Sequence, residues 1–306
     1  MQAENFTSYP TSAKHAMLRT PHQRGVTLIE LMVGIAIGLL VVAVAMGALM
    51  VSRGVSGTIS DASAIQQQSA YVMRVIGLQL RQAGSLYLNP NPADAPADSP
   101  AMVPVAFETV ATSPTRSFDP ATDTLSSASG ALTVGYRRYK ESVYTSAADQ
   151  TITRNCLGGP SDDAASPSNT DQRVDSVFQL VGSELRCQGN GGTAQPIAQN
   201  VANFQVRYLM QDNTVPTNPT IQYVAAAAVT DWLKVQAVEV CLVLYGSEAI
   251  DMPTDGTSTY RDCDAASTPV DMATLTGTRA RRMHVAYRNV FQLRSQGLTK
   301  EQLLPL

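Results

Sequence analysis

The sequence is poor in charge and in the residues on which most catalytic sites depend. Only 15% of its 306 residues are charged, and only three are histidines. One histidine, His284, follows residue 25, and no G-x-S-x-G, Walker A or H-E-x-x-H motif occurs. A Ser-His-Asp arrangement would therefore depend on a single histidine within an expected strand. We expect no catalytic residues, no cofactor and no enzymatic activity.

An excess of basic residues is also missing. The chain has 22 Lys and Arg against 25 Asp and Glu, which gives a net charge of −3. A leader ending at Gly25 would remove three cations and one anion, and the remainder would carry −5. Nucleic-acid-binding domains need a basic face, so we predict no nucleic-acid partner. The cluster Arg279, Arg281 and Arg282 could contact a phosphate or an acidic partner, but a charged strand edge that discourages aggregation is the preferred interpretation.

Metal-binding patterns are weak. No C-x-x-C pair is present to begin a tetrahedral zinc site. One polar loop carries four oxygen-bearing side chains, but they lack the ligand order and glycine of an EF-hand, so a solvated loop is preferred over a calcium site: Asp162, Asp163, Asn169 and Asp171. We predict no metal.

Four cysteines are the only ones in the chain, and all follow the long apolar segment. An even number of cysteines in an oxidising compartment indicates disulfides, and four cysteines allow three connectivities. We favour sequential pairing, Cys156–Cys187 and Cys241–Cys263. In the chain-entropy model each loop closure of this size contributes about 3 kcal/mol to stability.

A long apolar run is the most informative feature that is present. The segment 31–51 has 21 residues without a charge, and as a helix it would rise about 31 Å, enough to cross a bilayer core. The upstream cations Lys14, Arg19 and Arg24 favour a cytoplasmic amino end. We therefore expect a single-pass anchor in an inner membrane, with the residues after about 52 on the periplasmic side.

Glu30 lies at the start of this run and needs a physical reason. A carboxylate in lipid costs about 2.5–3.5 kcal/mol at a helix centre, so such residues are rare and usually functional. The apolar run is too long for an ordinary secretory signal. A plain signal-anchor helix could keep Glu30 near the cytoplasmic interface by snorkelling, and this alternative stays open.

The helix is expected to continue beyond the membrane. There is no proline between Val26 and Leu88, and one helix of about 55 residues would be roughly 80 Å long. Gly84 and the proline-rich stretch 89–100 should end it. Apolar or small residues recur at spacings of three and four, which predicts one buried face: Val55, Ile59, Ala62, Ile65, Ser69, Val72, Ile76 and Leu80.

After residue 100, short apolar runs alternate with polar loops. Their composition predicts strands at Leu132–Arg138, Ser176–Val181, Glu184–Cys187, Phe204–Leu209, Val235–Leu244 and Met283–Leu293. The expected fold class is α+β, with a long amino-terminal spine helix packed on an antiparallel sheet. The expected organisation is a leader (1–25), an apolar helix half (26–51), an amphipathic helix half (52–84) and a β-rich globular head (100–306).

Two parts of the sequence resemble a known family. The run RGVTLIELMVGIAIGLL resembles the class III signal of type IV prepilins, and segments such as RRMHVAYRNVFQLR resemble PilW-type minor pilins. The resemblance implies that a prepilin peptidase cleaves after Gly25 and methylates the new amino group of Val26. It also implies that Glu30 pairs with the amino terminus of a neighbouring subunit. Val26 stands where many pilins have Phe, and a start at Met17 would give a leader of ordinary length.

The resemblance further implies a function in fibre assembly. The expected role is a minor pilin that helps to initiate a type IV pilus and lies near its tip. Its expected partners are the prepilin peptidase, other minor pilins, the major pilin, a tip adhesin and the inner membrane. Two alternatives remain: a minor pseudopilin of a type II secretion system, and a membrane-anchored periplasmic binding module that never polymerises.

Overall fold

The computed structural model describes residues 25–84, 87–88, 106–107, 110–114, 116–139, 144, 151–160, 172–212, 220–264 and 268–294. The calcium candidates in loop 161–171, and the leader before Gly25, lie outside these residues. The chain divides into two compact units after Arg53.

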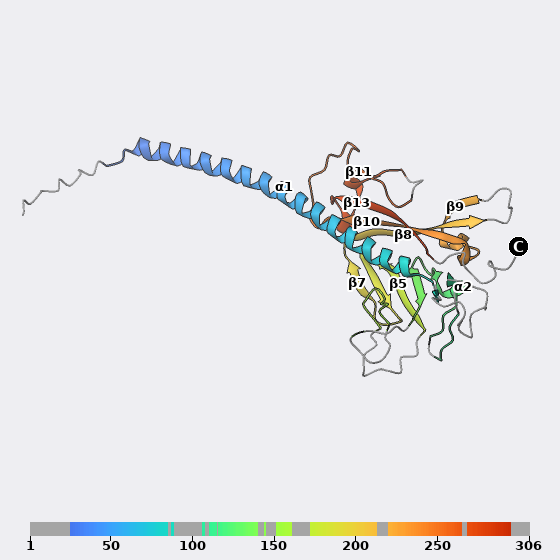
Figure 1. The fold of residues 1–306 in the computed structure, drawn as a ribbon. Helices are drawn as coiled ribbons and strands as arrows, with labels where there is room; N and C mark the ends of the chain where they lie inside the picture. Colours follow the sequence, from blue (N-terminus) through green and yellow to red (C-terminus); the bar gives the residue numbers. More distant parts are fainter. Residues whose placement is uncertain are drawn as a thin grey trace, which may run out of the picture. The chain divides into compact units, whose positions relative to one another are not determined.

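The first long element is α1, Leu28–Gln82, drawn at the blue end of the ribbon in Figure 1. It confirms the predicted uninterrupted helix of 55 residues. Within the described residues it is the one helix long and apolar enough to cross a membrane. The helix ends before Gly84, which adopts φ = +91° and donates its N–H to the carbonyl of Gly135 over 2.9 Å. A positive φ favours glycine, so Gly84 turns the chain into the head.

A four-stranded antiparallel sheet forms one layer of the head, in the order β13-β10-β8-β9. Its central strand β10 is buried on both faces, because apolar side chains cover each side of it. The strands are β8 (Val201–Asp212), β9 (Thr220–Val224), β10 (Val235–Tyr245) and β13 (His284–Gln292).

A five-stranded antiparallel sheet forms a second layer, in the order β3-β4-β5-β6-β7. Consecutive strands are neighbours throughout this sheet, although the connection from β4 to β5 is long and spans residues 138–172. The strands are β3 (Leu125–Ser126), β4 (Leu132–Arg137), β5 (Arg173–Val181), β6 (Glu184–Gly189) and β7 (Gln195–Ala198).

Smaller elements complete the described head. Two short strand pairs are β1 (Tyr87–Leu88) with β2 (Ala106–Phe107), and β11 (Thr259–Tyr260) with β12 (Val270–Asp271). The short helices are α2 (Pro120–Asp123), η2 (Ala226–Ala228), η3 (Trp232–Lys234), η4 (Met272–Thr274) and η5 (Gly277–Arg279).

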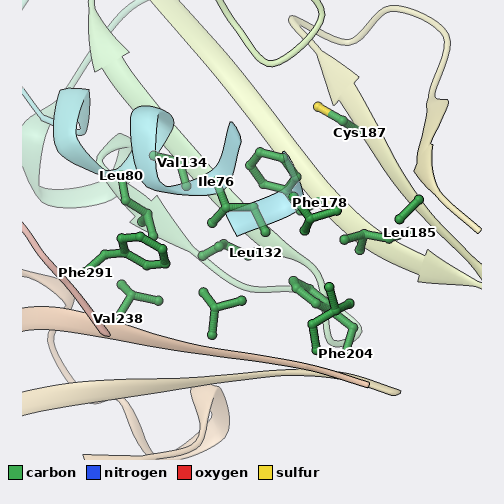
Figure 2. Close-up of a cluster of buried hydrophobic side chains, with 14 of the residues drawn as sticks. Ile76, Leu80, Leu132, Val134, Phe178, Leu185, Cys187, Phe204, Val238 and Phe291 are labelled. Carbon is green, nitrogen blue, oxygen red and sulfur yellow. The ribbon is translucent and has the colours of Figure 1, made fainter. Parts of the chain in front are cut away.

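The main hydrophobic core joins α1 to both sheets. Figure 2 shows Ile76 and Leu80 of α1 among side chains from the five-stranded sheet, such as Phe178, and from the four-stranded sheet, such as Val238 and Phe291. The predicted helix face is confirmed at the core end, where these residues are buried: Ile65, Ser69, Val72, Ile76 and Leu80. It is wrong at Val55 and Ile59, which are exposed because no part of the described head covers them.

The structure confirms the α+β class and all six predicted strands, with ends that differ by up to three residues. The strands form two main sheets, and the apolar faces of both contribute to the core around α1. The predictions missed β7 and β9. Both are edge strands with mostly exposed side chains, so they lack a continuous apolar pattern.

Candidate processing and assembly site

The helix start is closed by a reciprocal set of hydrogen bonds between Thr27 and Glu30. Glu30 Oε2 accepts from the Thr27 N–H over 3.1 Å and from the Thr27 hydroxyl over 3.0 Å. The Glu30 N–H donates in return to Thr27 Oγ1 over 3.3 Å. This is a capping box, in which the N-cap Thr and the third helical residue satisfy each other. Sequence reasoning missed it, although the Thr-x-x-Glu spacing is its signature.

The capping box leaves part of the Glu30 carboxylate available. Within the described residues both accepted bonds go to Oε2, and none goes to Oε1. Gly25 and Val26 are exposed immediately before the helix. Gly25, Val26 and Glu30, the residues predicted from the sequence, therefore lie within six residues of one another. Gly25 and Val26, on either side of the predicted cut, are exposed, and within the described residues Glu30 Oε1 accepts no hydrogen bond.

The apolar half of α1 has no cover within the described chain. Every residue from 25 to 53 is exposed, including the large side chains of Leu28, Ile35, Leu39 and Val44. Contiguous apolar surface of this extent marks a membrane-embedded or protein-covered segment. Lipid, neighbouring subunits or both must cover it in the cell.

A second carboxylate of α1, Asp61, holds the helix to the head. Its Oδ1 accepts from the Ser247 N–H over 3.1 Å and from the Ser247 hydroxyl over 2.6 Å, and its Oδ2 accepts from the Glu248 N–H over 2.9 Å. A Cβ on Gly246 would lie 2.4 Å from Oδ2, so the loop approaches this closely only with glycine there. We name Asp61, Gly246, Ser247 and Glu248 the Asp61 clamp.

The electrostatics of the Asp61 clamp favour an ionised carboxylate. Burial of Asp61 opposes ionisation, but the hydrogen bonds from Ser247 and Glu248 and the nearby Arg282 charge outweigh it and lower the pKa of Asp61. Sequence reasoning missed this residue, because it assigned Ala62 to the buried face and did not consider Asp61. The available signal was an Asp four residues before Ile65, on the same helix face.

A second polar contact fixes the last turns of α1 to the five-stranded sheet. The Ser176 hydroxyl of β5 donates to Gln79 Oε1 over 2.8 Å, and Gln79 Nε2 donates to the Arg154 carbonyl over 3.3 Å. Ser176 Oγ also accepts from the Cys156 N–H over 3.0 Å. The helix is thus attached to one sheet through Gln79 and to the end of the other through Asp61.

Both disulfides connect loops to buried strands. The structure pairs Cys156 with Cys187 and Cys241 with Cys263, the sequential pairing favoured from the sequence. Cys187 lies in the main core, while Cys241 and Cys263 lie in a smaller core with Val243 and Tyr260 on the opposite face of β10. The bridges therefore hold the segment before residue 160 and the segment after β11 against the two sheets.

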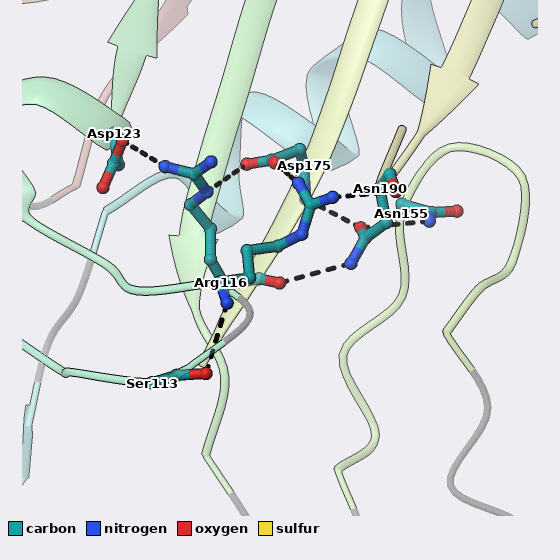
Figure 3. A network of polar contacts seen from close by, with 7 residues as sticks. Ser113, Arg116, Asp123, Asn155, Asp175 and Asn190 are labelled. Carbon is teal, nitrogen blue, oxygen red and sulfur yellow. Dashed lines mark hydrogen bonds and ion pairs between the residues drawn. The ribbon is translucent and has the colours of Figure 1, made fainter. Parts of the chain in front are cut away.

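A polar network fixes the segment before α2 to the five-stranded sheet (Figure 3). Asp175 of β5 forms ion pairs with Arg116 and with Arg173, whose Nε lies 3.0 Å from Asp175 Oδ1. Arg173 also pairs with Asp123, and the Arg116 guanidinium donates to the Asn190 carbonyl over 3.0 Å. Burial raises the pKa of Asp175, and the Arg173 and Arg116 charges oppose that rise. Two cations face two anions here, which is typical of a structural network.

The described residues contain no group of three or more His, Cys, Asp and Glu side chains arranged to hold a metal ion. The cluster of Arg279, Arg281 and Arg282 was interpreted as a charged strand edge. The structure corrects this interpretation, because the three arginines precede β13 and contact other groups of the same chain. Arg279 contacts His284 and Tyr260, Arg281 pairs with Asp251, and Arg282 donates to the carbonyls of residues 246 and 247.

Comparison with known proteins gives this arrangement its context. Residues 168–295 match the family model described as Type IV Pilus-assembly protein W, and residues 20–46 match the prokaryotic N-terminal methylation motif. The second match contains Gly25, Val26 and the capping box. The chain thus combines a type IV pilin-like methylation motif with a carboxy-terminal region similar to PilW proteins.

Other comparisons are more distant. The Type IV-like pilin TTHA1219 from Thermus thermophilus is 12% identical, and the similarity covers 75% of this chain and 96% of that one, with a TM-score of 0.33. No curated protein matches the chain. The PilW match begins shortly before β5 and extends to the end of β13. It therefore includes the Ser247 and Glu248 side of the Asp61 clamp and the second disulfide.

Proposed function

We propose that prepilin peptidase cleaves the chain after Gly25 and methylates Val26, and that the mature subunit helps to initiate a type IV pilus and lies near its tip. Its partners would be other minor pilins, the major pilin and a tip adhesin. The head would face the periplasm while α1 is anchored in the inner membrane. The role is structural, without catalysis.

One observation carries the proposal: a capped carboxylate with a free oxygen lies four residues after Val26, at the start of an uncovered apolar helix. Cleavage would create an α-amino group at Val26. A charge in an apolar environment is tolerated chiefly when it is paired. Glu30 Oε1 is the acceptor that the amino terminus of a neighbouring subunit would use.

The first experiment is intact-mass and amino-terminal analysis of the protein extracted from membranes. A chain that begins at N-methylated Val26 supports the proposal. A chain that begins at Met1 or Met17 contradicts it and leaves a plain anchored periplasmic protein.

Matched variants sharpen the experiment. Gly25→Ser should abolish cleavage, because the peptidase recognises the residue before the cut. Gly34→Ser, at another exposed glycine of the same segment, should be cleaved normally. A shortened, methylated Gly25→Ser protein would contradict the assigned cleavage position.

Incorporation separates a pilus subunit from a pseudopilin. Pili sheared from cells should contain the mature protein at low abundance, together with the other minor pilins. Detection only in a secretion complex, with none in sheared pili, would favour the pseudopilin alternative. The PilW match over residues 168–295 favours the pilus.

A further inference from the structure

His284, the first residue of β13, is held in one chemical form by its surroundings. It is 4% exposed, and its ring stacks on Tyr260 at 4.8 Å and on Tyr245 at 5.6 Å between centroids. Its backbone N–H donates to Met272 Sδ over 3.2 Å. Both ring nitrogens have partners from the segment just before the strand.

The partners determine the tautomer. His284 Nδ1 lies 2.8 Å from the Arg282 carbonyl oxygen, which can only accept, so Nδ1 carries the hydrogen. His284 Nε2 lies 3.1 Å from Arg279 Nε, which can only donate, so Nε2 has no hydrogen. Only the neutral imidazole protonated on Nδ1 satisfies both contacts.

A second proton would break this arrangement. It would bind Nε2 and oppose the N–H of the Arg279 guanidinium, so that two donors and two positive charges would face each other. The pKa of His284 is lowered, mainly by burial and also by the Arg279 charge. The hydrogen bond to the Arg282 carbonyl and the Asp262 charge oppose this shift without reversing it. Tyr260 contributes its hydroxyl, which accepts from the same Arg279 guanidinium over 2.6 Å.

The neighbourhood of His284 is connected to the Asp61 clamp. Arg282, whose carbonyl accepts from His284, extends its guanidinium to the carbonyls of Gly246, over 3.0 Å, and Ser247. The Gly246 N–H donates to the Met283 carbonyl over 2.9 Å. The segment 282–284 therefore supports the loop whose N–H groups hold Asp61. Nearby, Arg281 forms an exposed ion pair with Asp251.

We propose that neutral His284 is an acid-sensitive latch that keeps Arg279 and Arg282 in place, and that its protonation releases the loop 246–248 from Asp61 of α1. The stabilisation is fully present above the pKa of an unfolded histidine, about 6.5, and is lost as the pH falls through the lower folded value. Acidification would loosen the head at the point where α1 leaves it.

The test is hydrogen exchange of the protein in detergent at about pH 7.5 and about pH 5, measured by mass spectrometry. Free histidine titrates in this pH range, whereas most carboxylates do not. After correction for intrinsic exchange, peptides covering 58–64 and 244–250 should exchange several-fold faster at the lower pH. Peptides from β4 and β5 should not change. Equal protection of the first two peptides at both pH values would refute the latch.

Two variants keep the result tied to His284. His284→Gln can accept from Arg279 and donate to the Arg282 carbonyl but cannot take the second proton, so its exchange should not respond to this pH change. Arg279→Gln removes the opposing cation, and its amide oxygen can accept from a protonated Nε2, so the response to this pH change should become much smaller. A response as large as that of the wild-type protein, in either His284→Gln or Arg279→Gln, would overturn the proposal.

Discussion

The two carboxylates of α1 are held in opposite ways. Within the described residues, the Glu30 carboxylate accepts only from Thr27, three residues away. The Asp61 carboxylate accepts from Ser247 and Glu248, nearly two hundred residues further along the chain. A local partner moves with the helix and can be exchanged for another donor. A tertiary partner fixes the helix against one surface. The comparison indicates that one carboxylate closes the helix start locally, whereas the other fixes the helix to the head.

The two halves of the helix also differ in whether the chain itself covers their side chains. Up to Arg53 every described side chain is exposed, although nearly all are apolar. From Asp61 onward one face is buried between two sheets. Helical stability in the second half comes from packing within the chain, while the first half depends on what covers it in the membrane or fibre.

Loss of the Glu30 carboxylate has the largest expected effect. The comparison would fail if Glu30→Ala destabilised the head, as loss of Asp61 should. Glu30→Ala should leave cleavage and head stability unchanged but remove the protein from sheared pili, because the amino terminus of its neighbour loses its counter-ion. Immunoblots of sheared and membrane fractions measure this directly. Normal incorporation of Glu30→Ala would end the pairing role.

A pair of identical truncations tests the two halves of the helix. Ile76 is 0% exposed in the core, and Ile37 is 60% exposed. Ile76→Ala should lower the free energy of unfolding of the head by about 2–5 kcal/mol. Ile37→Ala should change it by less than about 0.5 kcal/mol. Urea unfolding in detergent, followed by circular dichroism, gives both values, and equal values would show that the halves are not independent.

Removal of the second carboxylate should cost less than the core truncation. Asp61→Ala leaves the Ser247 and Glu248 N–H groups without their partner, which should lower the free energy of unfolding by about 2–3 kcal/mol. Asp61→Asn keeps the shape of the side chain and removes its charge.

The pH dependence identifies the charge as the cause. Because the folded pKa of Asp61 is lowered, its contribution is present above the unfolded value of about 3.9 and is lost as the pH falls through the folded value. The wild-type protein should therefore lose more stability in acid than Asp61→Asn does. An equal loss of unfolding free energy in the two proteins as the pH falls would contradict this assignment.

Much of the fold follows from sequence patterns that reflect burial. The uninterrupted helix, the strands β4, β5, β6, β8, β10 and β13, and the cysteine pairing all came from periodicity, composition and spacing. Edge strands β7 and β9 did not, because exposed strands carry little apolar pattern. The division of the strands into two sheets was not predicted, because an apolar pattern marks a strand as buried but does not say which strand it pairs with.

The site was predictable only where its chemistry is local in sequence. Gly25, Val26 and Glu30 are close together, and a short motif contains them. The Asp61 clamp and the contacts of His284 join residues that are far apart, and nothing in the chain near Asp61 predicts the loop at Ser247. A charged residue on a helix face that packs into a core was the one available clue.

Two glycines of α1, one exposed and one packed against the head, provide the smallest contrast. A Cβ on Gly77 would lie 2.5 Å from Phe291 Cε1, whereas a Cβ on Gly54 meets nothing within 4 Å. Alanine is a better helix former than glycine by about 1 kcal/mol, but overpacking costs about 1–3 kcal/mol. Gly54→Ala should therefore be neutral or stabilising in urea unfolding, and Gly77→Ala should lose up to about 2 kcal/mol. Adding Phe291→Leu should recover part of that loss, since the smaller side chain makes room. A stabilised Gly77→Ala protein would show that the Phe291 contact does not require glycine.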